Sequence, residues 1–431
     1  MTKKRVNVVT MGCSKNLVDS EVLLNQLERG KFEVLHDSCE SNFDAVFINT
    51  CGFIHDAKQE SIDMILDYVE AKKRGDIGKL YVIGCLSERY RKELEKEIPE
   101  VDRYFGKFEL KAIVDELKIT CQPEYIYERK ITTPSHFAYL KISEGCNRSC
   151  SFCAIPMMTG RHKSRTIENL LNEAHYLAKK GVREILLIAQ DLSYYGIDIY
   201  GKNLLSELIE KISEINGIEW IRLHYLYPTK FPFEILTVMR ENPKVCKYLD
   251  VPLQHIANPV LKNMLRHVSR EETEMLIKKI KMEVPEAVIR TTMLVGFPGE
   301  TEQDFEELKQ FIRETKFERL GVFKYSHEEG TFASKKFDDN ISEEVKQARA
   351  NEIMELQRQI SAELNQQKTG QVFKVIVDRK EGGFYIGRTE FDSPEVDGEV
   401  LISSAFKLNK GEFVNVKITG AEDYDLFGRI E

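Results

Sequence analysis

The sequence predicts an α/β protein in three parts: an N-terminal parallel α/β domain, a central open partial barrel of six βα units, and a small C-terminal all-β barrel. Short apolar runs alternate with helical segments up to about residue 120, and the alternation resumes with longer units from about 136 to 340. Turn signals then recur between alternating apolar strands after Gly370. The expected domain bounds are 1–122, 132–364 and 365–431.

The N-terminal part contains three strand-like runs, RVNVVT, DAVFINT and KLYVIG, each followed by a helical segment. We expect these helices to begin at Ser20, Gln59 and Glu88. Such alternation is typical of a parallel sheet wound with helices. The segment 121–134 contains prolines and is predicted to be a connector.

The central part contains six candidate strands separated by helical stretches. Six units are too few for a closed eight-stranded barrel, but they suffice for an open one with its chemistry at the C-terminal strand ends. A polar helix is expected at 342–367, before the small barrel. The six strands are expected at 137–143, 184–190, 220–226, 247–253, 288–297 and 319–326.

The amino-acid composition indicates in which cellular compartment the protein works and which kinds of partner it binds. The chain has nine cysteines, a net charge of -8 and no apolar run near the ~20 residues of a membrane span. We expect a cytoplasmic protein whose thiols stay reduced, so that clustered cysteines are metal ligands or catalysts. Acidic and basic residues are interleaved, which does not indicate a nucleic-acid groove.

Three cysteines, Cys146, Cys150 and Cys153, lie in the stretch SEGCNRSCSFCAIP, directly after the first strand of the central part. Closely spaced cysteines hold iron-sulfur clusters, usually through four thiolates, and a cluster with three protein ligands keeps one iron open to a small molecule. Alternatives are a zinc site completed by His162, a redox pair formed by Cys150 and Cys153, and chance clustering of buried thiols.

A second set of cysteines, Cys13, Cys51 and Cys85, is spread along the N-terminal part, but each follows a predicted strand directly. Because the carboxyl ends of parallel strands meet at one edge, these thiols are expected to converge on a second open cluster. The alternative is three buried structural cysteines. Each of these cysteines has a glycine next to it that allows close backbone approach, namely Gly12, Gly52 and Gly84. The remaining cysteines share no spacing and are expected to be ordinary small apolar residues; they are Cys39, Cys121 and Cys246.

The run EGCNRSCSFCAIP resembles the signature loop of radical S-adenosylmethionine (AdoMet) enzymes, whose partial barrel has six βα units. The resemblance implies that Cys146, Cys150 and Cys153 hold a [4Fe-4S] cluster whose open iron is chelated by AdoMet. Reductive cleavage of AdoMet then yields a carbon radical, which is needed when hydrogen must leave an unactivated carbon.

The whole chain is similar to the methylthiotransferases of this superfamily. The resemblance implies a second [4Fe-4S] cluster, here at Cys13, Cys51 and Cys85, which presents sulfur, while AdoMet supplies both the radical and the methyl group. It also implies an electron donor such as a flavodoxin or ferredoxin. The motifs GCSKNLVDSE, DVPLQHI, YSHEEGT and DSPEVDG look like the branch that modifies the β-carbon of an aspartate in the twelfth small-subunit ribosomal protein.

The net charge of the C-terminal barrel agrees with a basic protein substrate. Residues 369–431 hold 8 Lys and Arg against 12 Asp and Glu, a net of -4, whereas RNA affinity depends on basic contacts to phosphate. Direct nucleic-acid binding is therefore not expected. Two alternatives remain: a transfer-RNA adenosine methylthiotransferase, and a non-catalytic zinc or iron-sulfur module that binds the ribosome.

Polar residues at the strand ends of the central part are expected to bind AdoMet or substrate. The alternative for each is a satisfied structural polar group. His224 and His255 are among these polar residues, and Arg161 or Arg165 is a candidate for holding a substrate carboxylate. The predicted AdoMet contacts are Gln190, Asp191, Arg222, Gln254 and Gly296.

Overall fold

The computed structural model describes residues 3–119 and 127–431, so part of the predicted connector, including Cys121, lies outside the described residues. The chain divides into two compact units built from interleaved segments. Unit 1 comprises Met1–Thr133, Tyr139–Asn147 and Cys153–Tyr176. Unit 2 comprises Pro134–Ala138, Arg148–Phe152 and Leu177–Glu431.

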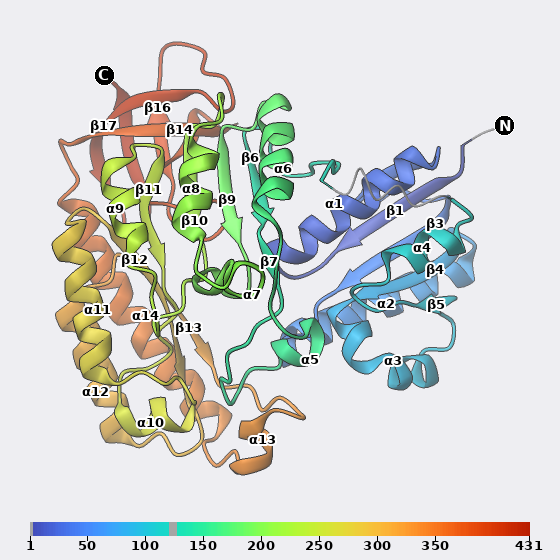
Figure 1. Ribbon diagram of the computed structural model, residues 1–431, viewed down its shortest axis with the longest axis horizontal. Helices are drawn as coiled ribbons and strands as arrows, with labels where there is room; N and C mark the ends of the chain where they lie inside the picture. The colour runs from blue at the N-terminus through green and yellow to red at the C-terminus, as the bar shows by residue number, and fades with distance from the viewer. Residues whose placement is uncertain (1–2, 120–126) are drawn as a thin grey trace. The chain divides into compact units, whose positions relative to one another are not determined.

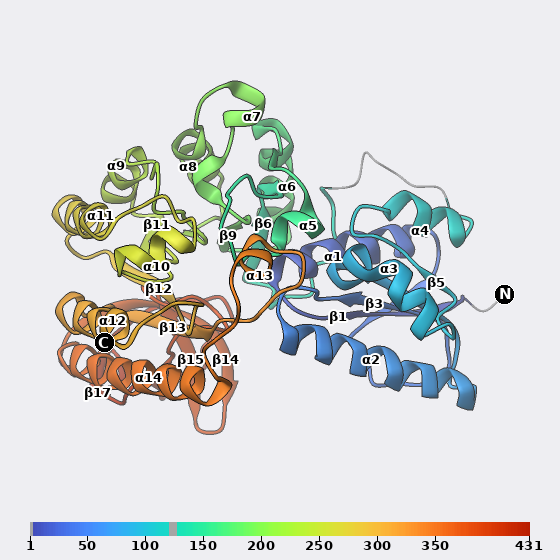
Figure 2. The same cartoon turned by 90° about the horizontal axis from the view of Figure 1, so that it is seen from below.

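Unit 1 contains a five-stranded parallel sheet in the order β2-β1-β3-β4-β5 (Figure 1). Helices lie on both faces, with α1 and α2 on opposite sides of the sheet (Figure 2). The strands are β1 (Arg5–Thr10), β2 (Glu33–His36), β3 (Phe43–Thr50), β4 (Ile77–Gly84) and β5 (Arg103–Tyr104), and the helices are α1 (Ser14–Arg29), α2 (His55–Arg74), α3 (Cys85–Glu97) and α4 (Leu110–Glu116).

The two sheet faces are buried by different helices. Ile65 and Val69 of α2 pack with the buried side chains of one face, and Leu23 and Leu24 of α1 pack with those of the other. Strands covered on both sides become nearly continuous apolar runs, which explains why β1, β3 and β4 are recognisable from the sequence. The short strands β2 and β5 were not predicted.

The three helices after β1, β3 and β4 begin three to six residues earlier than predicted. Helix α1 begins at Ser14 rather than Ser20, because the Leu17 N–H already donates to the Cys13 carbonyl at 3.1 Å. Helix α3 begins at Cys85 itself. The early starts place Cys13 and Cys85 at helix N-termini, where backbone N–H groups favour negative charge.

The second sheet has six strands in the order β13-β12-β11-β10-β9-β6, so their spatial order follows their order in the chain, which confirms the open six-unit partial barrel (Figure 1). All six predicted strands are present. They are β6 (Phe137–Lys141), β9 (Glu184–Ile188), β10 (Trp220–Leu223), β11 (Val245–Asp250), β12 (Val288–Val295) and β13 (Arg319–Lys324). Helix α13 (Phe332–Lys336) follows the last strand, and the helices between the strands include α6 (Ile167–Lys179), α7 (Ile197–Tyr200), α8 (Leu205–Ser213), α9 (Glu234–Glu241), α10 (Asn258–Asn263), α11 (Arg270–Glu283) and α12 (Glu302–Thr315).

The C-terminal part is a closed five-stranded barrel, as predicted, preceded by the expected long helix α14 (Glu343–Gln366). Within unit 2 the barrel packs on the six-stranded sheet, where the rings of Trp220 and Phe413 meet edge to face at 4.8 Å. The barrel strands are β14 (Val372–Glu381), β15 (Phe384–Thr389), β16 (Val400–Ser403), β17 (Phe413–Ala421) and β18 (Leu426–Ile430).

Within residues 3–119 and 127–431, none of the helices combines the length and the apolar composition that crossing a bilayer requires.

Candidate functional site

The cysteines of the N-terminal sheet lie at its carboxyl edge. Cys13 follows β1 and is the N-cap of α1, Cys51 follows β3, and Cys85 is the first residue of α3 after β4. Because β1, β3 and β4 are neighbours in one parallel sheet, their carboxyl ends present these three residues side by side.

Two glycines show how closely the cysteine segments approach one another. A Cβ at Gly12 would lie 2.8 Å from the Cβ of Cys51 and 3.0 Å from its Sγ. A Cβ at Gly52 would lie 2.9 Å from the carbonyl carbon of Cys85. Only glycine fits at such distances, so the edge is shaped to bring the three thiols together, and the soft sulfur donor set suits an iron-sulfur cluster.

The three thiols differ in acidity. Desolvation raises the pKa of Cys13, but Lys15, Lys107 and nearby backbone N–H groups outweigh this effect and lower it. Burial raises the pKa of Cys51, and it raises the pKa of Cys85 to about 12. Since thiolates are the metal-binding form, cluster assembly on this edge must release protons, chiefly from Cys51 and Cys85.

A buried lysine lies beside these cysteines. The Lys107 side chain is only 3% exposed, and its Nζ donates to Asp19 at 2.9 Å and to the side-chain oxygen of Asn16 at 3.3 Å. The same oxygen accepts the Cys85 thiol at 3.6 Å. Burial lowers the pKa of Lys107, but Asp19 and Glu144 outweigh burial and raise it well above its usual value, so the ammonium stays charged next to the site.

The charges continue from Lys107 to the segment that carries the second cysteine set. Lys141 pairs with Asp19 and, at 2.8 Å, with Glu144, which is 3.9 Å from Lys107 Nζ. Glu144 ends β7 (Ser143–Glu144), which pairs with β8 (Lys163–Ser164), and it precedes Cys146 by two residues. Alternating charges of unit 1 therefore tie the edge of the N-terminal sheet to the start of the three-cysteine loop.

Cys146, Cys150 and Cys153 all lie on the loop between β7 and α5 (Ile155–Thr159). The Cys146 N–H donates to the Gly160 carbonyl at 3.2 Å, which fixes the start of the loop. Gly145 has a φ of 83°, and a Cβ there would lie 2.2 Å from the Arg161 carbonyl oxygen. The loop therefore requires glycine immediately before its first cysteine.

The zinc alternative requires His162 to join the three cysteines as a ligand. Among the residues with described positions, no three His, Cys, Asp or Glu side chains are grouped so as to hold one metal ion. His162 instead has its Nε2 3.0 Å from the Ser164 hydroxyl. A four-iron cluster needs no such tight group, because each cysteine binds a different iron and the thiolates stay further apart.

The predicted AdoMet residues fall into two groups. Asp191, buried after β9, accepts the Ser193 N–H at 2.9 Å and pairs at 2.7 Å with Arg148 of the three-cysteine loop. Arg222 is fully buried, pairs with Glu184 at 2.8 Å and donates to backbone carbonyls of residues 389 and 390. These bonds give Arg222 a structural role at the C-terminal barrel, and its contact with AdoMet stays a prediction.

The remaining candidates lie after strands β9, β11 and β12, as predicted. Gln254 has a φ of 76°, and its N–H and C=O bond to Thr292 and Leu294 at 2.8 and 2.7 Å. At Gly296 a Cβ would lie 2.3 Å from the Lys346 side chain, so this glycine is required by packing against α14. Gln190 follows the buried end of β9. Their binding roles remain predictions.

The other sequence candidates are mostly occupied by structural bonds. Arg165 pairs with Glu173 at 2.7 Å, whereas Arg161 is exposed. The His224 ring lies 3.0 Å from the Ser393 hydroxyl. His255 is buried and accepts the Ala257 N–H at 3.0 Å. Of these, Arg161 is exposed, Arg165 is half-buried, and both histidines are buried.

Several polar residues around the two cysteine sets were missed: Asn16, Lys107, Tyr227 and Arg266. Asn16 follows Cys13 by three residues and Lys107 follows β5, so their positions near strand ends were a usable signal. Tyr227 directly follows the strand predicted at 220–226, so its position was a signal of the same kind, whereas Arg266 lies on a loop between two helices and has no such signal.

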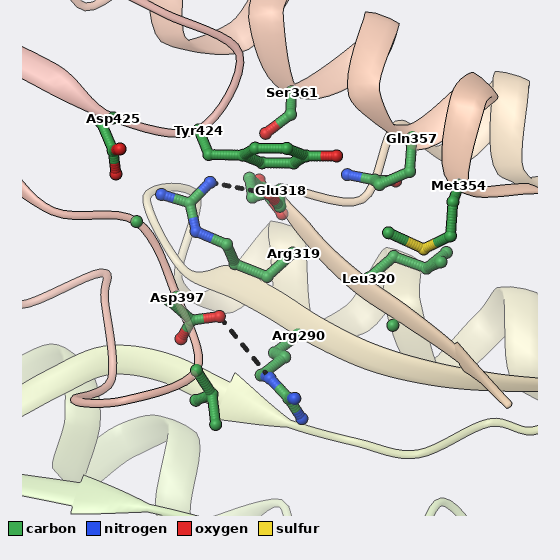
Figure 3. Close-up of a pocket in the computed structure, with 13 residues that line it drawn as sticks. Arg290, Glu318, Arg319, Leu320, Met354, Gln357, Ser361, Asp397, Tyr424 and Asp425 are labelled. Atoms are coloured by element: carbon green, nitrogen blue, oxygen red, sulfur yellow. Dashed lines mark hydrogen bonds and ion pairs between the residues drawn. The ribbon is translucent and has the colours of Figure 1, made fainter.

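One cavity of about 330 Å³ lies elsewhere in unit 2 (Figure 3). Arg290 and Arg319, which line it, stand at the starts of β12 and β13, and Arg290 pairs with Asp397 at 3.6 Å. The cavity is therefore at the opposite end of these strands from the carboxyl ends, where the candidate site residues lie.

Family models match three regions of the chain: Uncharacterized protein family UPF0004 at residues 5–106, the Radical SAM superfamily at 140–312, and the TRAM domain at 369–430. Solved structures share the fold. A radical S-adenosylmethionine methyltransferase, TsrM, from Kitasatospora setae has a TM-score of 0.56 at 14% identity, covering 74% of this chain and 73% of that one. The cobalamin-dependent radical enzyme OxsB has a TM-score of 0.52 at 12% identity, covering 83% and 56%.

The matched domain and the fold define a radical AdoMet (SAM) enzyme, a class that works with a [4Fe-4S] cluster and AdoMet. Curated relatives are similar along the whole chain. "Ribosomal protein uS12 methylthiotransferase RimO" of Bacteroides thetaiotaomicron is 56% identical, covering 100% of this chain and 99% of the relative, and that of Flavobacterium psychrophilum is 56% identical, covering 99% and 98%. The chain belongs to the RimO family of radical AdoMet methylthiotransferases.

Proposed function

We propose that this enzyme methylthiolates the β-carbon of an aspartate in ribosomal protein uS12. When bound, two [4Fe-4S] clusters and AdoMet supply the carbon radical, the sulfur and the methyl group. The full-length similarity to relatives named for uS12 supports the substrate. The domain bounds of this proposal are 1–122, 132–364 and 365–431, and its compartment is the cytoplasm, where a flavodoxin or ferredoxin serves as electron donor.

The proposal of a second cluster is supported by one observation: β1, β3 and β4 end at the same edge of the sheet, where Cys13, Cys51 and Cys85 follow them. In the proposal these three thiolates bind three irons of one cluster and leave the fourth open for sulfur. Lys107 adds a fixed positive charge beside them, which favours an anionic cluster.

In the other site, Cys146, Cys150 and Cys153 hold the cluster that binds AdoMet. Asp191 orients Arg148 on the same loop through their 2.7 Å ion pair. Gln190, Asp191, Gln254 and Gly296 follow strands β9, β11 and β12, where backbone and side-chain groups are placed to bind AdoMet. Arg222 belongs to the predicted contacts, but its observed partners favour a structural role.

A specific observation keeps the transfer-RNA alternative in view. Although the C-terminal barrel is acidic overall, half of its eight basic residues line one groove of about 510 Å³. Tyr385 and Phe406 lie in the same groove, and Phe406 is 76% exposed. Tyr385 is mostly buried at 8% exposure, so Phe406 is the exposed aromatic side chain of this groove, and basic residues beside an exposed aromatic are typical of single-stranded RNA sites. The four basic residues are Arg379, Lys380, Lys407 and Lys410.

The deciding experiment offers both substrates to the same enzyme. Anaerobically reconstituted protein, supplied with AdoMet and a reduced flavodoxin, is incubated with uS12 or with transfer RNA carrying the hypermodified adenosine. We expect uS12 to gain the mass of one methylthio group at an aspartate, with no change in the RNA. Modification of adenosine without modification of uS12 would reverse the assignment. Variants with alanine at Cys13 or Cys150 are the inactive controls, each losing a different cluster.

A further inference from the structure

The sulfur of Cys150 has two polar neighbours outside its own loop. The Arg266 Nη1 donates to Cys150 Sγ at 3.3 Å, and the Tyr227 hydroxyl lies 3.5 Å from the same sulfur. Arg266 is 3% exposed and Tyr227 is 7% exposed. One cysteine of the loop is therefore held by a buried, permanently charged donor.

Tyr227 fixes the position of this guanidinium. The Cζ of Arg266 lies 4.2 Å from the centre of the Tyr227 ring, and that of Arg148 lies 4.0 Å from it. The Tyr227 hydroxyl also donates to the backbone carbonyl of Arg266 at 3.1 Å, and Arg266 Nη2 donates to the Pro252 carbonyl. Ring contacts and hydrogen bonds together leave Arg266 little freedom to move away from the sulfur.

The cysteine loop is fastened to the same segment by backbone bonds. The Ser151 N–H donates to the Met264 carbonyl at 2.9 Å, and the Ser151 hydroxyl donates to the Asn263 carbonyl at 2.8 Å. Leu265 and His267, on either side of Arg266, have φ values of 54° and 52°. Non-glycine residues in this region cost free energy, so the surrounding bonds must hold the turn that aims Arg266.

Hydrogen bonds and charges at cluster sulfurs set the reduction potential of iron-sulfur centres. Reduction adds negative charge, which a neighbouring cation stabilises. We propose that Arg266, held by Tyr227, is a positioning residue that raises the reduction potential of the AdoMet-binding cluster through its bond to Cys150. The proposal rests on the assignment of Cys150 as a ligand of that cluster, made above, and the electron it concerns comes from the flavodoxin or ferredoxin.

The test isolates one cluster and measures its redox equilibrium. Protein with alanine at Cys13, Cys51 and Cys85 retains only the cysteines of the AdoMet-binding cluster, and it is reconstituted, poised at a series of potentials and read by electron paramagnetic resonance. In this background R266Q should lower the ratio of reduced to oxidised cluster at a fixed potential about tenfold, equal to ~59 mV for a one-electron couple. R266K, which keeps a charge, and Y227F, which keeps the ring, should give smaller decreases.

R270Q is the matched control. It removes the same charge from the start of α11, four residues away, where the half-buried Arg270 pairs with Glu274 and Glu307. Its titration should equal that of the parent. An unchanged titration of R266Q would overturn the tuning role. If R266Q holds no iron while R266K and Y227F titrate like the parent, Arg266 is only structural and the proposal fails. A parent without any cluster signal would instead refute Cys150 as a ligand, and the proposed function with it.

Discussion

The Lys107 ammonium lies 2.9 Å from the Asp19 carboxylate and shares the Asn16 side-chain oxygen with the Cys85 thiol. In this pair the Lys107 side chain is buried and Asp19 is half-buried, and the pair lies between a cysteine site and the charges that lead to β7. Breaking a buried pair by removing one partner is costly, because the other charge is left without full compensation.

K107M is therefore expected to lower the free energy of unfolding of the apoprotein by roughly 3 kcal/mol, measured by urea denaturation. It should also reduce iron loading in protein whose Cys146, Cys150 and Cys153 are replaced by alanine. K111M, which removes an exposed lysine from the nearby helix α4, is the control and should behave like the parent. Equal stability of both variants would show that the pair contributes little.

Gly12 offers a second test of the N-terminal cysteine edge. G12A would place a methyl group 2.8 Å from the Cβ of Cys51, at a φ of 85°, and we expect this clash to prevent cluster assembly there. Iron content after reconstitution should fall to about half that of the parent, since the other cluster is unaffected. G75A is the matched control, because Gly75 has a φ of 84° but nothing within 4 Å of the added methyl group. Full iron content in G12A would contradict the close approach.

The three-part architecture and both cysteine sets were predictable from the sequence, because strand alternation and cysteine spacing are local signals. Cys13 and Cys85 each follow a recognisable apolar strand, so parallel pairing alone brings them to one edge. The short strands β2 and β5 carry too few residues for a visible period. Strand-end position also could not tell whether Arg222 faces a ligand or an ion pair, since that depends on Glu184 and on the distant C-terminal barrel.

The acidity difference among the N-terminal thiols predicts an order of alkylation in the apoprotein. The pKa of Cys13 is lowered by Lys15, Lys107 and backbone N–H groups despite desolvation, whereas burial raises that of Cys85 to about 12. Iodoacetamide at pH 8 should therefore label Cys13 first and Cys85 last, as followed by peptide mass spectrometry. Reconstitution with iron and sulfide should protect both residues, while the exposed Cys39 stays reactive. Equal labelling rates in the apoprotein would contradict the assigned environments.

The burial of His255 should make the free energy of unfolding smaller at acidic pH. Its pKa falls from 6.5 to about 3, chiefly because of burial. Asp304 partly opposes this decrease in pKa, and Arg349 adds to it. Between these values the unfolded chain binds a proton that the folded chain does not, so stability falls as pH drops below 6.5, by at most about 1.4 kcal/mol per pH unit. H255N keeps an acceptor for the Ala257 N–H, and it should reduce the change of the urea unfolding midpoint with pH between pH 6.5 and 4.5. H175Q, at an exposed histidine, should keep the parental slope.

Variants of Arg222 can show whether this side chain contacts AdoMet or only forms a structural ion pair. Arg222 and Arg388 both pair with Glu184 at 2.8 Å in the interior of unit 2, so R222M should destabilise the apoprotein by roughly 3 kcal/mol in urea unfolding. If its role is structural, AdoMet affinity of the reconstituted protein, measured by equilibrium dialysis, should stay within about twofold of the parent.

The sharper comparison is R222K, which keeps the charge near Glu184 but loses the planar geometry that also reaches the carbonyls of Thr389 and Glu390. Its stability should lie between those of the parent and R222M, with AdoMet affinity again unchanged. A tenfold or greater loss of affinity in R222K, at a stability close to that of the parent, would instead restore the sequence prediction that Arg222 binds AdoMet. The pair of measurements separates the two roles because only a ligand contact changes affinity independently of folding.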